Sequence, residues 1–391
     1  MQSIQHTPER PLWQARFAVG TVFFIMGAIF ANWAVRIPTV SANLDLSEGE
    51  LGLALMLGSV GVILGLLITG GLIARFGSHR VSTVMVILKA LSLGFISLAV
   101  DFYTLSLVLF FYGMANSMTD VAINAQAIEV ERKRGKPIMN SFHGLWSIGT
   151  FVGSLIGTGF INVGTTTAQH FWTLTVIFML IAFATQHMLL RIDGEKDQND
   201  QAPFSLPPRM VWGLGAVAFA AGISEGAVAD WSGLYLRDIV EVSEAWVPLG
   251  FVAFSLTMTT GRFLGDTVAE WLGNVRLIRL SGVLATSGIL LPIFFPSLVT
   301  ALLGFGIAGL GLAVGIPLAF SASGKLPNIS PGRAVAGVAT IGYAGFLVGP
   351  PIIGFVAEAT SLRFGLAIVA MLASTMIFTA GALDVRKAKS A

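Results

Sequence analysis

The chain contains no cysteine among its 391 residues, and only 11% of its residues are charged. The absence of thiols excludes disulfide bonds and thiolate metal ligands, while the redox state of its compartment stays open. A soluble domain carries roughly 25% charged residues, so the shortage of charge argues against a soluble globular protein. The sequence also lacks a histidine metal motif, a serine nucleophile elbow and a phosphate-binding glycine loop. Because no nucleophile, base and orienting group stand at usable spacing, we expect no enzyme activity, no metal and no cofactor.

Apolar residues and glycine are abundant instead. Hydrophobic residues make up 54% of the chain, 45 residues are glycine, and the mean hydropathy is +0.80. This composition is typical of a polytopic membrane protein, because small residues let helices pack closely in lipid. No basic stripe with interleaved aromatic residues indicates a nucleic-acid partner. We therefore expect the lipid bilayer to surround most of the chain.

Apolar runs of about 20 residues are long enough to cross the roughly 30 Å hydrocarbon core as helices. The uncharged stretch from Leu280 to Gly324 is too long for one span, and Pro292 with Pro296 marks the break. The sequence predicts twelve spans, centred near residues 17–40, 51–74, 81–100, 103–128, 138–163, 170–190, 210–236, 245–267, 277–295, 297–323, 334–358 and 363–384.

The same residues recur at a constant separation of 196 positions. Two halves built from one duplicated unit are the architecture of secondary transporters, whose substrate site lies between the repeats. We therefore predict an all-α membrane protein with twelve transmembrane helices in two pseudo-symmetric six-helix bundles. The bundles comprise residues 1–190 and 210–391, and a polar, flexible linker at residues 191–209 joins them. The recurring positions are Ser47-Glu48 and Ser243-Glu244, Gly65 and Gly261, Gly77 and Gly273, Arg80 and Arg276, Gly113 and Gly309, Gly149 and Gly345, and Gly153 and Gly349.

Most of the 23 basic residues lie in loops on one side of the predicted spans. Loops on the other side carry acidic residues instead, among them Asp45, Glu48, Asp101 and Glu244. Since cytoplasmic loops retain Lys and Arg, we expect the linker and both termini to be cytoplasmic. The expected location is the cytoplasmic (inner) membrane of a bacterium-like cell, with the chain acting as a monomer.

The segment Gly70–Arg80, GGLIARFGSHR, resembles the signature loop of the major facilitator superfamily. It departs from the family at Ala74, where the family has an aspartate of the cytoplasmic gate. The second half repeats the loop as Glu270–Arg276, which keeps an acidic residue and loses the adjacent arginine. A plainer interpretation of both loops is a pair of tight, positively charged cytoplasmic turns. The resemblance covers nearly the whole chain and implies a major facilitator fold, with gating roles for Arg75, Arg80, Glu270 and Arg276.

A narrower resemblance lies in the fourth and fifth predicted spans. Asp120–Asn124 is similar to an acidic segment of fucose permease-like symporters of sugar and protons, and Asn140–Ser147 follows where that family places sugar-contacting side chains. This resemblance implies that Asp120 is the proton-coupling residue and that the solute is sugar-like. The acidic residue in the first helix of that family has no match, because Ala34 stands at the corresponding place. The two-acid coupling scheme of the family is therefore not supported.

Three polar residues form a stripe along the fourth span, independently of any relative. Asn116, Asp120 and Asn124 recur every four residues, which keeps them on one face of a helix. A carboxylate about midway through a bilayer is costly unless it is paired, hydrated or protonated, which makes Asp120 a functional candidate. The alternative is a structural pair between Asp120 and Lys89 of the third span.

The fifth span separates two faces. His143 and Trp146 share one face and are predicted to line the solute path. His143 is a candidate for donating to the solute or for moving protons, and equally for satisfying a neighbouring backbone carbonyl. The other face is a ridge of small residues for helix packing, formed by Gly149, Gly153 and Gly157 and repeated as Gly345, Gly349 and Gly354.

The first and seventh spans carry a matching pair, Asn32-Trp33 and Asp230-Trp231. We predict that Glu225 lines the central cavity and that Asp230 pairs with Arg36 in an outer gate. The alternative for Arg36 is to bind an anionic group of the substrate, because guanidinium suits carboxylate and phosphate. Aromatic residues would stack on a sugar ring or serve only in packing. The predicted solute contacts are Asn32, Trp33, Asn116, Asn124, His143, Trp146, Glu225 and Tyr343, while Arg262 and Asp266, spaced i to i+4, are expected to form a structural pair.

These features predict a secondary active transporter that moves a small, polar, sugar-like solute by alternating access, coupled to protons. Two alternatives stay open. One is proton-driven efflux of amphipathic compounds, although the Gly-Pro signature of such antiporters is replaced by Gly153-Ser154 in the fifth span. The other is a membrane receptor that binds a ligand without transporting it.

Overall fold

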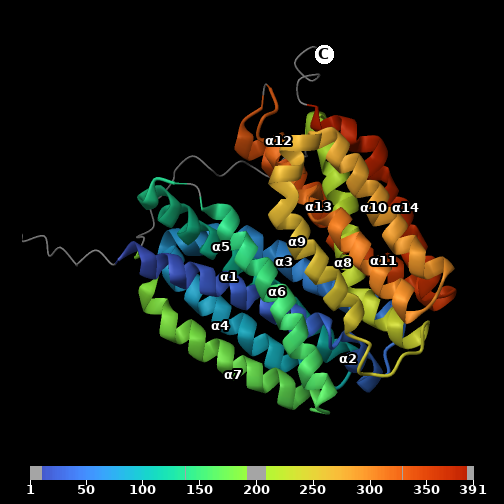
Figure 1. Ribbon diagram of the computed structural model, residues 1–391. Helices are drawn as coiled ribbons and strands as arrows, with labels where there is room; N and C mark the ends of the chain where they lie inside the picture. Colours follow the sequence, from blue (N-terminus) through green and yellow to red (C-terminus); the bar gives the residue numbers. More distant parts are fainter. Residues whose placement is uncertain (1–10, 137, 192–207, 328, 385–391) are drawn as a thin grey trace, which may run out of the picture.

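The computed structural model describes residues 11–136, 138–191, 208–327 and 329–384, and the regular structure in these ranges is helical throughout (Figure 1). Most of the expected linker, residues 192–207, and both chain ends, residues 1–10 and 385–391, lie outside the described ranges. The first half comprises α1 (Leu12–Ala34), α2 (Ile37–Asn43), α3 (Glu48–Phe76), α4 (Ser78–Ile96), α5 (Phe102–Arg134), α6 (Met139–Asn162), α7 (Thr167–Thr185) and the 3-10 turn Gln186–Met188. The second half comprises α8 (Trp212–Asp238), α9 (Leu249–Leu272), α10 (Asn274–Phe294), α11 (Leu298–Leu312), α12 (Gly315–Ser323), α13 (Pro331–Ala359) and α14 (Leu362–Thr379), with 3-10 turns at Arg209–Val211 and Ala380–Leu383.

Within the described ranges, eleven helical stretches are long and apolar enough to cross a membrane. All twelve predicted spans nevertheless have helical counterparts. The twelfth is α9, a helix of 24 residues that does not meet this test of length and composition. Two spans are interrupted: the first divides into α1 and α2, and the tenth into α11 and α12. Pro38 in the first turn of α2 explains the first break, since proline starts a helix well but cannot continue one. The break predicted from Pro292 and Pro296 falls between α10 and α11, as expected.

Several helices begin with a capping box, in which two side chains satisfy backbone N–H groups at the helix start. In α3, Ser47 accepts from the Glu50 amide at 3.2 Å, and Glu50 accepts from the Ser47 amide at 3.1 Å. Asp101 with Thr104 caps α5 in the same way, and Thr166 with Gln169 and Ser297 with Thr300 cap α7 and α11. All four caps lie in connections on the side of the bundles away from the predicted linker.

The internal repeat is visible in the backbone as matching turns. Gly77 ends α3 with φ 80° and ψ 147°, and Gly273 ends α9 with φ 78° and ψ 149°. A positive φ favours glycine because a Cβ atom would be strained there. Two residues other than glycine, Asp45 (φ 50°) and Glu241 (φ 56°), also adopt positive φ, and they too stand one repeat apart. The duplicated residues therefore encode duplicated turns.

Glycines let paired helices approach closely at repeated places. A Cβ on Gly113 of α5 would stand 2.0 Å from the Gly58 carbonyl oxygen of α3, and one on Gly309 of α11 would stand 2.4 Å from the Phe254 carbonyl oxygen of α9. The predicted ridge on α6 packs against α1, where a Cβ on Gly149 would meet the Phe24 carbonyl oxygen at 2.2 Å. Gly345 and Gly349 of α13 pack against α8 in the same manner, but Gly354 does not, because it packs against Glu48 and Gly52 of α3.

The two halves meet along α3 with α13, α6 with α9, and α2 with α8. We call the end where the chain leaves at Arg191 and returns at Pro208 the linker-side end, and the opposite end the closed end. At the closed end a Cβ on Gly52 would lie 2.5 Å from the Pro350 carbonyl oxygen, and Arg237 donates to the Pro38 carbonyl. Farther along α3, a Cβ on Gly70 or Gly71 would meet no described atom within 4 Å outside the neighbouring turns of its own helix. Helices α3 and α13 therefore touch at the closed end and diverge toward the linker-side end (Figure 1).

Candidate functional site

A cavity of about 340 Å³ lies between the two halves. Helices α1, α3, α5 and α6 of the first half and α8 and α13 of the second contribute to its wall. No lysine or arginine is among its described lining residues. The ionisable, amide and aromatic side chains that line it are Phe30, Trp33, Tyr112, Asn116, Asp120, Trp146, Glu225, Asp230, Tyr343 and Phe346.

The polar stripe predicted on the fourth span is present on α5, and two of its three members line the cavity. Asn124 donates from Nδ2 to the Asp120 carboxylate at 3.1 Å, which holds this carboxylate in place. Asn116 accepts from the ammonium group of Lys89, which is fully buried and also donates to the Met26 carbonyl at 3.1 Å. The alternative of a direct Asp120–Lys89 pair is therefore wrong for this structure, because Lys89 binds Asn116 instead. The two charges remain close enough to act on each other through space.

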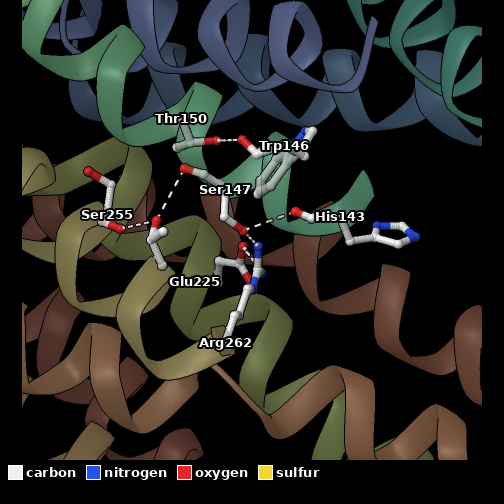
Figure 2. Close-up of polar contacts among 8 residues, drawn as sticks. His143, Trp146, Ser147, Thr150, Glu225, Ser255 and Arg262 are labelled. Atoms are coloured by element: carbon white, nitrogen blue, oxygen red, sulfur yellow. Dashed lines mark hydrogen bonds and ion pairs between the residues drawn. The ribbon is translucent and has the colours of Figure 1, made fainter. Parts of the chain in front are cut away.

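A second charged cluster joins α8, α9 and α6 (Figure 2). Arg262 of α9 donates from Nη2 to Glu225 Oε1 at 3.2 Å, and from Nη1 to Ser147 Oγ of α6, also at 3.2 Å. Its guanidinium carbon stands 5.2 Å from the centre of the Trp146 ring, a cation–π arrangement. Arg262 thus links the two halves, since Ser147 and Trp146 belong to the first and Glu225 to the second.

The expected structural pair of Arg262 with Asp266 is wrong. Asp266 accepts from Asn140 Nδ2 at 3.1 Å, while Arg262 turns toward Glu225. The i to i+4 spacing permits a pair, but a long guanidinium side chain reaches past its own helix to a partly buried carboxylate. Sequence reasoning therefore missed Arg262 as a site residue. The available signal was its position halfway along a spanning helix, where an ionisable residue is a functional candidate.

The expected gate between Arg36 and Asp230 is not formed in this structure. Arg36 is 4% exposed and donates from Nε to His170 Nδ1 at 3.1 Å and from Nη2 to the Thr165 carbonyl at 2.8 Å. Because an arginine only donates, His170 Nδ1 must accept, and its Nε2 then donates to Asn32 Oδ1 at 2.8 Å. Asn32, a predicted solute contact, is fully buried in this network and away from the cavity wall.

Glu225 and Asp230 both line the cavity, although they are five residues apart on α8. The helix is continuous from Trp212 to Asp238. Glu225 is paired with Arg262, whereas within the described part of the chain no hydrogen bond or ion pair engages Asp230.

The predicted common face of His143 and Trp146 is only half realised. Trp146 lines the cavity, whereas His143 is not part of its wall. The His143 ring packs edge-on against Phe23, with 5.2 Å between ring centres, and points away from Glu225 and Arg262 (Figure 2). His143 is therefore misplaced among the predicted solute contacts in this conformation.

The four residues of the signature loops lie at the linker-side end, away from the cavity. Arg75 stacks over the neighbouring Phe76 ring, with its guanidinium carbon 5.1 Å from the ring centre. Arg75, Arg80, Glu270 and Arg276 are all exposed, and none takes part in an ion pair within the described ranges. This agrees with the divergence of α3 and α13 at the same end.

Comparison with known proteins covers nearly the whole chain. The sequence profile of the Major Facilitator Superfamily matches residues 17–328. An uncharacterized MFS-type transporter of Yersinia pestis is 32% identical over 361 residues, covering 92% of this chain and 94% of that protein. Membrane protein MosC of Rhizobium meliloti is 34% identical over 365 residues, covering 92% of this chain and 89% of that protein.

Solved structures of the nucleoside transporter NupG share the fold. A variant of NupG superposes with a TM-score of 0.78 over 95% of this chain and 100% of that chain. A second NupG structure gives a TM-score of 0.72 over 94% and 98% of the two chains. The identity is 14% in both cases, so the likeness concerns the arrangement of helices alone.

Proposed function

The chain belongs to the Major Facilitator Superfamily and is a multi-pass membrane transporter of a small-molecule solute; we propose that the solute is polar and sugar-like and crosses by alternating access. In this proposal residues 1–190 and 210–391 are the two rocking halves, joined by a linker at 191–209. The linker and both termini face the cytoplasm. In this orientation the described conformation would be closed to the outside and divergent toward the cytoplasm.

The single observation that carries the proposal is the cavity between the halves. Its volume of about 340 Å³ falls within the roughly 300–1,000 Å³ usual for small-molecule sites. Both halves contribute polar and aromatic side chains to it, as a solute path between two repeats requires. Trp33, Trp146 and Tyr343 offer flat faces for a sugar ring, and Asn116 and Glu225 offer hydrogen-bonding groups.

We infer that Asp120 takes up and releases the coupled proton. It lines the cavity, and it bonds Asn124, so the two polar ends of the segment resembling fucose permease-like symporters act together. Lys89, held behind Asn116, supplies a positive charge that steadies the ionised form of Asp120 without neutralising it through a direct bond. This arrangement lets the carboxylate alternate between a protonated and an ionised form.

We further infer that the signature-loop residues form the cytoplasmic gate of the opposite state. Arg75, Arg80, Glu270 and Arg276 are exposed at the linker-side end, where α3 and α13 diverge. Closing that end would bring the two signature loops together and give Glu270 a basic partner from the first half. The present structure would then be the state in which this gate is released.

Uptake into proteoliposomes, with and without a pH gradient, tests the coupling. Asp120→Asn should abolish accumulation driven by the gradient while sparing downhill exchange, because the amide keeps the shape and cannot carry the proton. Asp45→Asn, the same change at an exposed loop residue, is the matched control and should accumulate solute like the unmodified protein. Accumulation by Asp120→Asn at the unmodified level would refute the coupling role.

Efflux of amphipathic compounds is a second candidate, which the largely apolar wall of the cavity favours. Aliphatic and aromatic residues supply most of that wall, including Met26, Phe30, Leu55 and Phe346. Sugars, nucleosides and amphipathic cations presented to everted and right-side-out vesicles would separate import from efflux. Binding without movement in either direction would instead indicate a receptor.

A further inference from the structure

Asp230 is an ionisable group of the cavity wall that has no partner in the described structure. The other two carboxylates of the wall are engaged: Glu225 binds Arg262 at 3.2 Å, and Asp120 accepts from Asn124 at 3.1 Å. A carboxylate at this depth is costly unless it is protonated or a cation, a hydrogen-bond donor or water meets it. A partner for the ionised form of Asp230 must therefore come from what occupies the cavity.

The balance of charge around the cavity points to the sign of that partner. Three carboxylates line the wall, and within the described residues no lysine or arginine does. Arg262 balances Glu225 from an adjoining hollow, and Lys89 lies behind Asn116 on the side of Asp120. With all three carboxylates ionised, these two cations leave the wall with one negative charge, at Asp230.

Tyr112 supplies a second unsatisfied polar group at the same cavity. The residue lines the wall and is 8% exposed, and among the described residues its buried hydroxyl has no hydrogen-bond partner. Asp230 lines the same cavity, and its charge acts on this hydroxyl through space. A buried hydroxyl without a partner costs free energy, and a ligand that displaces the atoms covering it and bonds it would recover that cost. Tyr112 belongs to α5 of the first half and Asp230 to α8 of the second, so one ligand that reaches both would bridge the halves.

Aromatic side chains complete the surroundings of these two groups. Trp33, Trp146 and Tyr343 line the same cavity. The faces of such rings attract a positively charged nitrogen, most strongly where water is excluded. An unpaired carboxylate in a cavity that aromatic side chains also line is the chemistry of a binding site for an organic ammonium group.

We propose that the transported solute carries a positively charged amino group, that Asp230 binds this group, and that Tyr112 bonds a hydroxyl of the same solute. The solute class is an amine-bearing polyol such as an amino sugar. This inference rests on the proposed function, because it names the chemistry of the solute that the carrier moves. It also gives binding a mechanical consequence, since the solute joins one group from each rocking half.

The test uses three probes that share one ring and differ in charge: glucosamine, glucose and glucuronate. Binding to the purified full chain is measured by quenching of intrinsic tryptophan fluorescence. We expect glucosamine to bind at least about tenfold more tightly than glucose, and glucuronate most weakly, as a charge-assisted contact implies. Asp230→Asn should remove this preference, Tyr112→Phe should weaken glucosamine binding, and Asp45→Asn should bind like the unmodified protein.

Several outcomes would overturn the inference. Equal or tighter binding of glucose or glucuronate would do so, as would an unchanged preference in Asp230→Asn or binding of none of the three probes. If Asp230→Asn does not fold, the ranking in the unmodified protein and the effect of Tyr112→Phe decide. Counterflow of the same probes in proteoliposomes separates the two levels of the proposal. Transport of glucose without glucosamine refutes this inference and leaves the proposed function standing, whereas glucosamine binding without transport of any probe refutes the proposed function and leaves only the binding chemistry of the site.

Discussion

A disulfide across the closed end should stop transport reversibly. Ser154 of α6 and Ser255 of α9 come from opposite halves, are both buried, and have their Oγ atoms 3.3 Å apart. A disulfide needs about 2.05 Å between sulfur atoms, so cysteines at these positions must close by about 1.2 Å, a shift within reach of ordinary side-chain movement. Because the chain has no cysteine of its own, the pair Ser154→Cys and Ser255→Cys introduces the sole thiols.

The expected result follows from the proposed alternating access. In that proposal, opening to the outside separates α6 from α9 at this end, and a covalent bond forbids that separation. Oxidised protein in proteoliposomes should therefore transport no faster than empty liposomes, and reduction should restore the rate. Each single-cysteine variant, treated with the same oxidant, is the control and should transport normally. A cross-linked protein that transports at the unmodified rate would refute the view that these two helices part during the cycle.

Two further predictions concern the internal contacts. Removing either partner of the Glu225–Arg262 pair, through Glu225→Gln or Arg262→Gln, should cost about 1.5–3 kcal/mol in the free energy of unfolding, as for hydrogen bonds to charged groups. A double-mutant cycle followed by thermal unfolding in detergent should show the two costs to be less than additive, and full additivity would contradict the pair. Gly113→Ala should lower the folded yield, because its Cβ would stand 2.0 Å from the Gly58 carbonyl oxygen. Gly70→Ala is the control and should be tolerated, since its Cβ would meet no described atom within 4 Å outside the neighbouring turns of its own helix. Equal yields of the two variants would contradict the close helix contact.

The helices and their pairing in two halves were largely predictable. In lipid every backbone polar group must be satisfied within the chain, so an apolar run of sufficient length must be helical. Positive φ at Gly77 and Gly273 explains why these two glycines recur, and close helix contacts explain Gly113 and Gly309. Each of these features depends on residues near one another in sequence or on a repeated local pattern.

The partners of the long polar side chains were not predictable in the same way. The spacing in the sequence pairs Arg262 with Asp266, whereas in the structure Arg262 binds Glu225 and Ser147. The sequence likewise predicts a pair of Arg36 with Asp230, whereas Arg36 binds His170 and Thr165. A guanidinium reaches several ångströms from its helix axis, so its partner depends on how neighbouring helices are rotated and crossed. Spacing along one helix carries no information about that rotation.

The amino-acid sequence by itself determined where the helices and turns lie. It also showed that Asp120 and Glu225 stand in otherwise apolar spans. Local hydrophobicity and backbone conformation decide these features. Only the tertiary structure decided which charges are paired. It placed Arg262 beside Glu225 and Trp146, left Asp230 and the Tyr112 hydroxyl without partners among the described residues, and set these two residues around one cavity. Such pairing depends on distances between helices remote in sequence, which only the packed bundle sets.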